Sequence, residues 1–257
     1  MMGELQKNTR FEHLLRLADT NLILGHRMSE WIGKSPILEE ELALTNIGLD
    51  LIGQARALYE HAVAVSGEED NRDADDLVFL RDAPEYKNLL LVERENGDFA
   101  HTMVRQMFYS AFAVPVWEAL TRSVDSEVAG IAGRAEKESL YHLRHASEWI
   151  LRMGDGTEES HQRVQDAVDA LWMYTGEMFD MDEVETAAFE AGHGVDLTAV
   201  RSEWEKTVRE VLTAATLDYP EDCWMLKGGR TGKHTEHLGH LLSDMQFLQR
   251  AYPGQKW

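Results

Sequence analysis

The sequence predicts an all-α fold built on a four-helix bundle, with additional helices in its C-terminal part. Only five prolines interrupt the 257 residues, and apolar residues recur with a 3.6-residue period over long stretches. The four longest stretches are joined by a short, a long and a short connection, the order found in ferritin-like bundles with one crossover. We expect a single domain over residues 1–257, with the core bundle at about 10–153 and the C-terminal helices at about 158–257.

The first two helices are delimited by glycine, serine and proline signals. The first spans about 10–32, where apolar residues lie on one face, and it ends near Gly33. The second spans about 36–65. Ser35 is expected as its N-cap and Pro36 as its first helical residue, because both residue types are favoured there. Three glutamates follow in its first turn, where the helix dipole stabilises negative charge.

The third and fourth helices follow a long connection. The stretch "SGEEDNRDADD" is expected to be an acidic, solvated loop, and an irregular segment leads on to an Asn-Gly turn. The third helix spans about 98–122 and is opened by Asp98, and the fourth spans about 125–153 and is stopped by Gly154. Further helices are expected at about 159–178, 182–191, 197–216 and 234–250.

Composition excludes several classes of function. The formal net charge of −21 disfavours nucleic acid and anionic membrane surfaces, since both are bound by clustered Lys and Arg. The single cysteine, Cys223, excludes an intramolecular disulfide and a cysteine-based zinc site. Because no apolar run approaches the ~20 residues of a membrane span and the N-terminus lacks a signal-peptide core, we expect a cytoplasmic protein.

The fourth helix carries the most conspicuous motif, "KESLYHLRH" at residues 137–145. Di-iron bundles hold metal with a Glu-x-x-His pair on one helix face. Here Tyr141 occupies the histidine position after Glu138, and the imidazole comes one residue later as His142. Placed at 100° per residue, His142 lies in the middle of the buried arc, Glu138 at its edge and Tyr141 farther out.

The other three helices offer few metal ligands. Asp50 lies in a plausible ligand position, but Gly53, three residues on, has no side chain. The first helix presents Asn21 inside its apolar arc, with Asp19 at the boundary, and the third offers only neutral groups such as Gln106 in its middle. A di-iron site needs about four carboxylates and two imidazoles, so we predict a vestigial metal site without metal. Its positions are Asn21, Asp50, Gly53, Gln106, Glu138, Tyr141 and His142.

Two alternatives for the inward-facing groups remain open. Glu138 and His142 can form a buried hydrogen-bonded pair, which satisfies both groups without metal. Alternatively, Asp50, Glu138 and His142 can form the centre of an unusual metal site. A ferritin-like storage protein is disfavoured because the third helix has no carboxylate between Asp98 and Glu118.

Two polar clusters lie near the C-terminus. In "HTEHLGH" the three imidazoles fan across the helix instead of converging, which favours an interface over a zinc site; the cluster comprises His234, Glu236, His237 and His240. The preceding glycine-rich loop carries Lys227, Arg230 and Lys233 beside a helix start, a combination that can hold a phosphate group. The alternative for this loop is a solvated surface segment.

Four segments carry a resemblance to a known family: "LALTNIGLDLIGQARALYEHA", "NLLLVERENGDFAHTMVRQ", "KESLYHLRHASEWI" and "GKHTEHLGHLLSDMQFLQRAYPGQKW". From about Phe11 to Trp257 the chain resembles the family of C subunits of bacterial phenylacetyl-CoA epoxidases. The resemblance implies a ferritin-like component of a multicomponent oxygenase, which converts phenylacetyl-CoA to its ring-1,2-epoxide in aerobic phenylacetate breakdown. It also implies a di-iron centre in the A subunit of that complex, and a reductase that uses NADPH, flavin and an iron–sulfur cluster.

For this chain the resemblance implies a structural subunit that has lost the metal and pairs with the catalytic A subunit. The expected partners are the A subunit, the other subunits and the reductase, with phenylacetyl-CoA bound at the complex and a homodimer as the form in isolation. We expect the interface near His234–Phe247. A weaker hypothesis places Lys227, Arg230 and Lys233 near the CoA phosphates.

Overall fold

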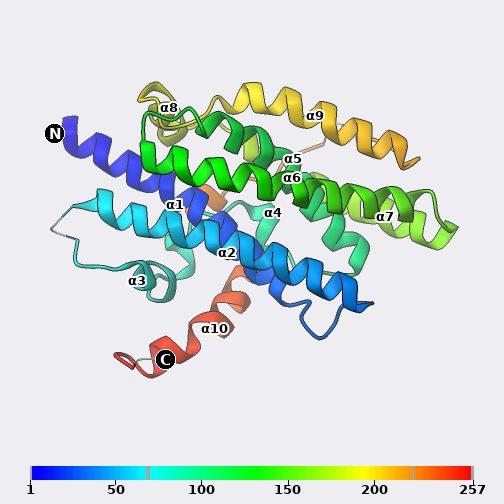
Figure 1. Cartoon of the computed structure of the whole chain (residues 1–257), viewed down its shortest axis with the longest axis horizontal. Coiled ribbons are helices and arrows are strands. Elements are labelled where there is room, and N and C mark those ends of the chain that lie inside the picture. The colour runs from blue at the N-terminus through cyan, green and yellow to red at the C-terminus, as the bar shows by residue number, and fades with distance from the viewer. Residues whose placement is uncertain (1, 68–69, 222, 256–257) are drawn as a thin grey trace.

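A computed structural model describes residues 2–67, 70–221 and 223–255, and it confirms the all-α prediction. Four long helices form the bundle: α1 (Met2–Ser29), α2 (Leu38–Ser66), α5 (Phe99–Leu120) and α6 (Ser126–Gly154). The long crossover between α2 and α5 contains α3 (Ala74–Phe79), η1 (Ala83–Glu85) and α4 (Leu90–Glu93). As Figure 1 shows, α2 and α6 lie side by side along one face of the bundle.

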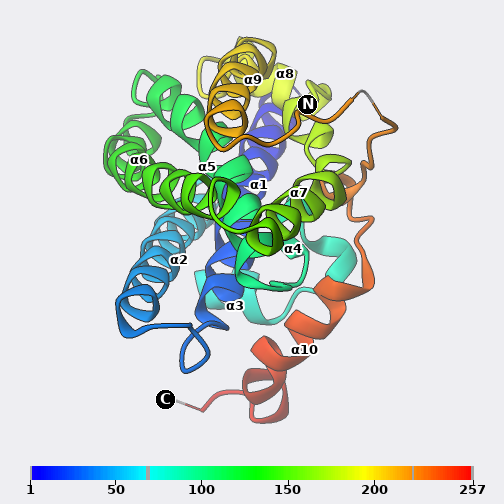
Figure 2. The same cartoon turned by 90° about the vertical axis from the view of Figure 1, so that its right-hand side faces the viewer.

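The C-terminal elements surround this bundle on two sides. α7 (Glu158–Trp172) and α9 (Leu197–Ala214) pack on α5, whereas α8 (Glu183–Glu190) packs on α1. The 3₁₀ turns η2 (Gly176–Phe179) and η3 (Gly229–Thr231) connect them. The last helix, α10 (Glu236–Ala251), packs mainly on the crossover segment and projects away from the bundle (Figure 2).

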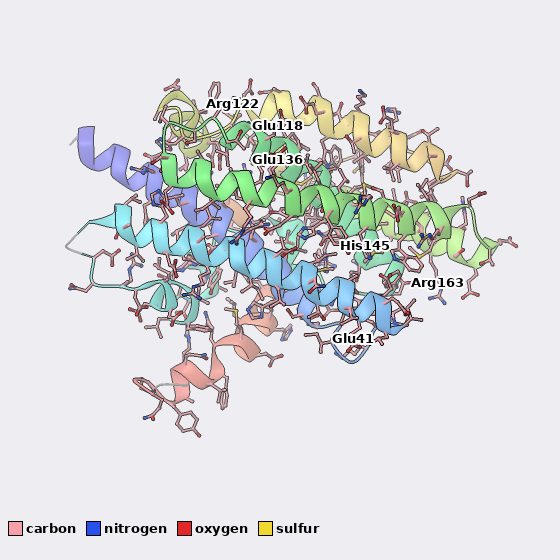
Figure 3. All side chains as sticks on the ribbon, in the orientation of Figure 1. Glu41, Glu118, Arg122, Glu136, His145 and Arg163 are labelled. Carbon is pink, nitrogen blue, oxygen red and sulfur yellow. The ribbon has the colours of Figure 1, made fainter. Side chains whose placement is uncertain are left out.

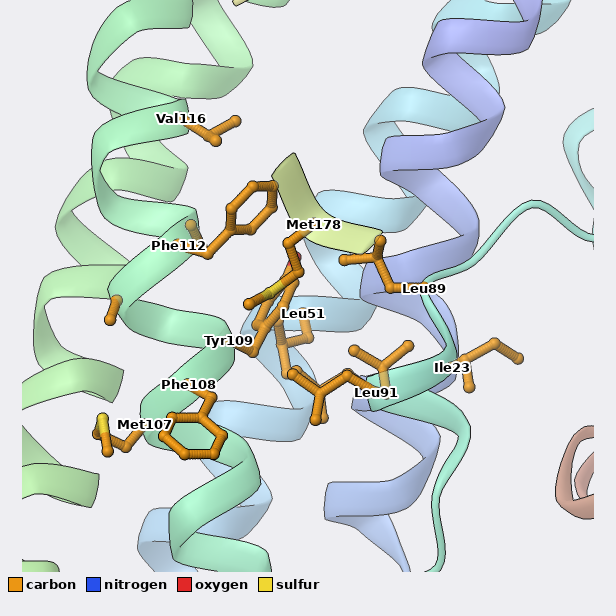
Figure 4. Packing of buried hydrophobic residues seen from close by; sticks show 14 of the residues in the cluster. Ile23, Leu51, Leu89, Leu91, Met107, Phe108, Tyr109, Phe112, Val116 and Met178 are labelled. Carbon is orange, nitrogen blue, oxygen red and sulfur yellow. The ribbon is translucent and has the colours of Figure 1, made fainter. Parts of the chain in front are cut away.

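Aromatic side chains fasten the outer helices to the core. The indole of Trp204 on α9 donates a hydrogen bond to the carbonyl oxygen of Phe108, at 2.8 Å, and the two rings are in contact. Trp172 of α7 packs against both rings. Figure 4 shows Met178 of η2 beside Tyr109 and other core side chains, so the middle of the bundle is filled by packed apolar groups.

Small residues set the distance between α1 and α2. A Cβ atom on Gly25 would lie 2.8 Å from a side-chain carbon of Ile52 and 3.2 Å from the carbonyl oxygen of Gly48. A Cβ atom on Gly48 would lie 3.1 Å from the hydroxyl of Ser29. The glycines therefore permit a close backbone approach, which a larger residue at either position would prevent.

A buried ion pair anchors the crossover to α1. Asp19, expected at the boundary of the apolar arc, is fully buried and accepts hydrogen bonds from Arg81, Tyr59 and the backbone N–H of Lys87. The guanidinium of Arg81 also stacks on the ring of Tyr86, with 4.3 Å between its central carbon and the ring centroid. Removal from water costs both charges several kcal/mol, so these contacts fix the crossover in one position.

Most helix ends lie near the expected positions, but α1 begins at Met2 instead of about residue 10, α7 ends at Trp172 instead of about residue 178, and α2 starts later than expected. Asp98 caps α5 by accepting from the backbone N–H of His101, and Asp125 caps α6. The prediction of Ser35 and Pro36 at the start of α2 was wrong. α2 begins at Leu38, because the Ser35 hydroxyl instead donates to the carbonyl oxygen of Trp31 in the preceding turn.

The predicted acidic loop is partly helical. Asp73 accepts from the backbone N–H of Asp76, and the side chain of Asp76 accepts from the backbone N–H of Asp73. This reciprocal capping box starts α3 within the acidic stretch. Residues 68–69 lie outside the described residues. Among the residues that the structure describes, no helix is long and apolar enough to cross a bilayer.

The buried ion pair yields a prediction for stability. Asp19→Asn leaves the Arg81 guanidinium buried without its counter-charge, so we expect a loss of about 3–5 kcal/mol in the free energy of unfolding. Glu60→Ala is the control, because it breaks an exposed pair with Arg56 and should change stability little. Urea denaturation followed by circular dichroism measures both, and equal small losses would contradict the anchoring role of Asp19.

Candidate functional site

Polar side chains of α2 and α6 face one another along a line that we call the polar seam. Its middle consists of Asp50 and Gln54 on α2 and of Glu138 and His142 on α6. The ring of His142 is 1% exposed, as the angular analysis predicted, and its Nε2 lies 3.1 Å from Oδ2 of Asp50. Asp50 sits at the edge of the seam with its side chain 33% exposed. This carboxylate–imidazole pair joins two helices that a di-iron bundle would join through metal.

Glu138 lies one turn from His142 but does not bind it, so the predicted hydrogen bond between the two was wrong. Its carboxylate accepts from Nε2 of Gln54 on α2, at 2.8 Å, and forms an ion pair with Arg134 on α6, whose Nε lies 3.2 Å away. The Arg134 guanidinium lies 3.3 Å from where a Cβ of Gly53 would stand, so the chain's own cation borders that position.

The positions on the other helices are also occupied by internal contacts. The side-chain oxygen of Asn21 accepts from the hydroxyl of Tyr109, and burial raises the pKa of that tyrosine. Gln106 is fully buried and donates to the hydroxyl of Ser110 at 3.0 Å. Tyr141 on α6 is 38% exposed and lies outside the interior. The structure thus brings Asp50 and His142 together, but it does not bring the seven positions into one site.

These residues do not fit a di-iron centre. Each of the three carboxylates has a different partner. Asp50 pairs with His142, Glu138 with Gln54, and Asp19 with Arg81 of the crossover. Within residues 2–67, 70–221 and 223–255, no group of three or more His, Cys, Asp or Glu side chains is placed to hold a metal ion. Two cations require about four carboxylates and two imidazoles around one cavity.

Sequence reasoning missed how far the polar seam extends. Glu40 of α2 pairs with Nε2 of His145 at 2.9 Å near one end, where Figure 3 labels His145. At the other end, His61 lies 2.8 Å from Asp125, which also binds Arg10. The sequence pattern that indicates the seam is the placement of Asp50, Gln54 and His61 on one side of α2. Their partners, on α6 and at its N-cap, lie far away in the sequence.

The C-terminal histidine cluster is divided between the interior and the surface, and its assignment as an interface was wrong for His234, which is internal. The ring of His234 lies 2.8 Å from Glu93 and 2.9 Å from the carbonyl oxygen of Tyr86, both in the crossover. Glu93 is fully buried and also accepts from the backbone N–H of Thr235. His237 lies 3.3 Å from a carboxylate oxygen of Glu95, whereas two members of the cluster are exposed: Glu236 and His240.

The glycine-rich loop is neither a solvated segment nor a free basic cluster. Arg230 is buried and donates to the carbonyl oxygens of Met178 and Asp180. Lys227 pairs with the Asp180 carboxylate, and Lys233 is exposed. A Cβ atom on Gly229 would lie 2.2 Å from the carbonyl oxygen of Asn88, so the loop packs tightly against the crossover. The hypothesis that Lys227, Arg230 and Lys233 together hold a phosphate group was therefore wrong, because the Arg230 guanidinium is buried and engaged within the chain.

The ion pair at His234 predicts a pH dependence. Burial would lower the pKa of His234, but the hydrogen bond and charge of Glu93 more than offset this and raise it above 6.5. The protonated ring thus contributes stability that is fully present below pH about 6.5 and is lost as pH rises through the folded-state pKa. His234→Gln should cost more unfolding free energy at pH about 5.5 than at pH about 8.5.

Urea denaturation of the wild type and the variant at both pH values measures this difference. His240→Gln is the matched control, because His240 is an exposed histidine on α10, which begins two residues after His234. A cost for His234→Gln that grows with pH would contradict the assigned direction.

Comparison with known proteins agrees with the fold and the sequence motifs. The family model described as "Phenylacetic acid catabolic protein" matches residues 1–257. The C subunit of 1,2-phenylacetyl-CoA epoxidase from Escherichia coli (strain K12) is 46% identical over 245 residues, which are 95% of this chain and 98% of that protein. The ferritin-like, all-α fold and the resemblance of the quoted segments are thereby confirmed. The chain belongs to the phenylacetic acid catabolic protein family.

Proposed function

We propose that this chain is a non-catalytic, structural subunit of an epoxidase that acts on phenylacetyl-CoA. The observation that carries the proposal is the polar seam, where Asp50, Glu138 and His142 are each hydrogen-bonded to another group of the same chain. The 46% identical relative is named as one subunit of an epoxidase, which supports membership of a complex. In this proposal the di-iron centre lies on the A subunit, and NADPH, flavin and the iron–sulfur cluster belong to a reductase.

Charge balance supports placing the metal elsewhere. The middle of the seam offers two carboxylates, Asp50 and Glu138, and one imidazole, His142, whereas the Glu40–His145 and His61–Asp125 pairs lie at its two ends. Both carboxylates already have partners, because Arg134 forms an ion pair with Glu138 and His142 lies within hydrogen-bond distance of Asp50. A pair of iron cations would have to displace these partners without the four carboxylates that such a centre uses.

Two alternatives find less support. The metal-binding oxygenase would require Asp50, Glu138 and His142 to converge, but Glu138 turns to Gln54 instead of His142. A storage protein would require acidic ligands on α5, where no carboxylate lies between Asp98 and Glu118. Neither alternative has a contact in its favour, so the structural role remains our proposal.

We further propose that the partner, the metal-bearing A subunit, contacts the outer face of α10. This helix projects from the bundle, and its outer face carries Phe247 and Leu248, which are 63% and 49% exposed. A groove of about 240 Å³ runs beside Phe247 between α10 and the crossover. Exposed apolar side chains next to a groove are typical of protein contact sites. The proposed interface with the A subunit therefore excludes His234 and lies on the C-terminal half of α10, around Phe247 and Leu248.

Metal content and turnover test the structural role. The purified chain should contain no stoichiometric iron, and the variant with Glu138→Gln and His142→Gln should support turnover when it is combined with the other subunits. We expect a smaller effect than the about 10- to 100-fold loss that follows removal of groups supporting a metal ligand. The variant's circular dichroism serves as the folding control. Two irons per chain, or a loss of turnover beyond that range in a folded variant, would overturn the proposal.

Co-purification tests the contact on α10. Phe247→Glu with Leu248→Glu should abolish co-purification with the tagged A subunit, because charges would be buried in an apolar interface. Leu42→Glu with Leu49→Glu is the matched control, since both leucines are about as exposed on α2. Retention of the complex by the α10 variant, or loss by the α2 variant alone, would contradict this placement.

A further inference from the structure

A small internal cavity lies between α1, α5 and α8, away from the polar seam. Its volume is about 30 Å³. Most of its wall is apolar, but one end carries ionisable groups. The apolar wall consists of Leu17, Leu89, Phe112, Val116, Leu120, Val195 and Leu197. The polar end consists of His13, Arg16, Glu185 and Arg230, and the hydroxyl-bearing residues Thr20 and Tyr109 complete the lining.

The polar end is a buried joint that fastens α8 to α1. Oε2 of Glu185 lies 3.1 Å from Nδ1 of His13, and Oε1 accepts from Arg16 at 3.2 Å. Arg230 lies 3.9 Å from the same carboxylate, and Asp182 binds Arg16 from the rim. Burial would raise the pKa of Glu185, but the neighbouring His13, Arg230 and Arg16 hold it far below its usual range, so the carboxylate is ionised.

Two nitrogen atoms of this joint remain unsatisfied. Nε2 of His13 and Nε of Arg16 are buried and have no hydrogen-bond partner among the described residues. Their residues are only 4% and 5% exposed, and both line the cavity. A buried polar group without a partner costs about 1–3 kcal/mol, so a ligand that satisfies them contributes directly to the stability of the joint.

The chemistry of the two nitrogens defines the ligand. Nε of Arg16 is a donor. Since Nδ1 of His13 faces an ionised carboxylate it carries a proton, so Nε2 is an acceptor in the neutral ring and a donor in the protonated ring. A molecule that serves both states must donate and accept hydrogen bonds. It must also be uncharged, because Arg16 and Arg230 are already balanced by Glu185 and Asp182.

Size restricts the ligand further. A water molecule needs roughly 10–15 Å³ of cavity volume, so about 30 Å³ admits one or two. We propose that this cavity is a specific hydration site, in which buried water bridges His13 and Arg16 and completes the joint between α1 and α8. The carboxylate–imidazole–water arrangement is that of a general base, but no organic substrate fits the space, so the role of the water is structural.

Crystals of the full chain test the proposal in two arms. In untreated crystals we expect ordered water within hydrogen-bond distance of Nε2 of His13 and Nε of Arg16. Under xenon pressure we expect no xenon in the cavity, because xenon enters dry apolar cavities. A cavity without ordered water that takes up xenon would overturn the proposal.

Oxygen-17 magnetic relaxation dispersion counts long-lived internal water in solution and provides an independent readout. His13→Leu removes one of the two polar partners and should lower the number of long-lived waters by one or two, in line with the volume of the cavity. His240→Leu is the matched control on the exposed face of α10 and should leave the number unchanged. An unchanged number in a folded His13→Leu protein would contradict the assignment. If that variant does not fold, the two crystal arms on the wild type decide the question.

Discussion

Buried negative charge must be compensated inside this protein, and that requirement organises both the bundle and its candidate site. An unpaired buried carboxylate loses its hydration without a replacement, so each one selects a cation or a hydrogen-bond donor from a distant segment. Six carboxylates are buried among the described residues: Asp19, Glu40, Glu93, Asp125, Glu177 and Glu185. Each has such a partner, and most of these contacts join two different elements of the fold.

The same constraint applies to the carboxylates between α2 and α6, which have hydrogen-bond or ion-pair partners within the chain. In a di-iron bundle the metal supplies the positive charge that holds facing helices together. Here the carboxylates along the seam between α2 and α6 have imidazole, guanidinium and amide groups as partners. The seam is therefore a set of polar contacts that join α2 to α6. Removing one partner of a contact lowers the free energy of unfolding, because the other partner stays buried. A rigid bundle of this kind suits a protein whose proposed task is to support a neighbour.

Charge compensation also accounts for the sequence interpretations that failed near the C-terminus. His234 and Arg230 lie in a polar, glycine-rich stretch that has the composition of a surface loop. Their acceptors, Glu93 and the carbonyl groups around Met178, are contributed by segments 50 to 141 residues away. No local pattern marks such pairs. The glycines of the loop were an indirect sign that it is packed against another segment. At Gly229 any side chain would collide with the carbonyl oxygen of Asn88.

The sequence by itself determined the helical architecture, the cap at Asp98, the burial of Asn21 and His142, and the family. These depend on periodicity, on short-range hydrogen bonds and on motif similarity, all of which can be read within a few turns of one helix. Only the tertiary structure decided that His142 pairs with Asp50, that Glu138 pairs with Gln54, and that His13 and Arg16 line one cavity. Angular position shows which way a side chain points, whereas its partner depends on how helices distant in the sequence are aligned against one another.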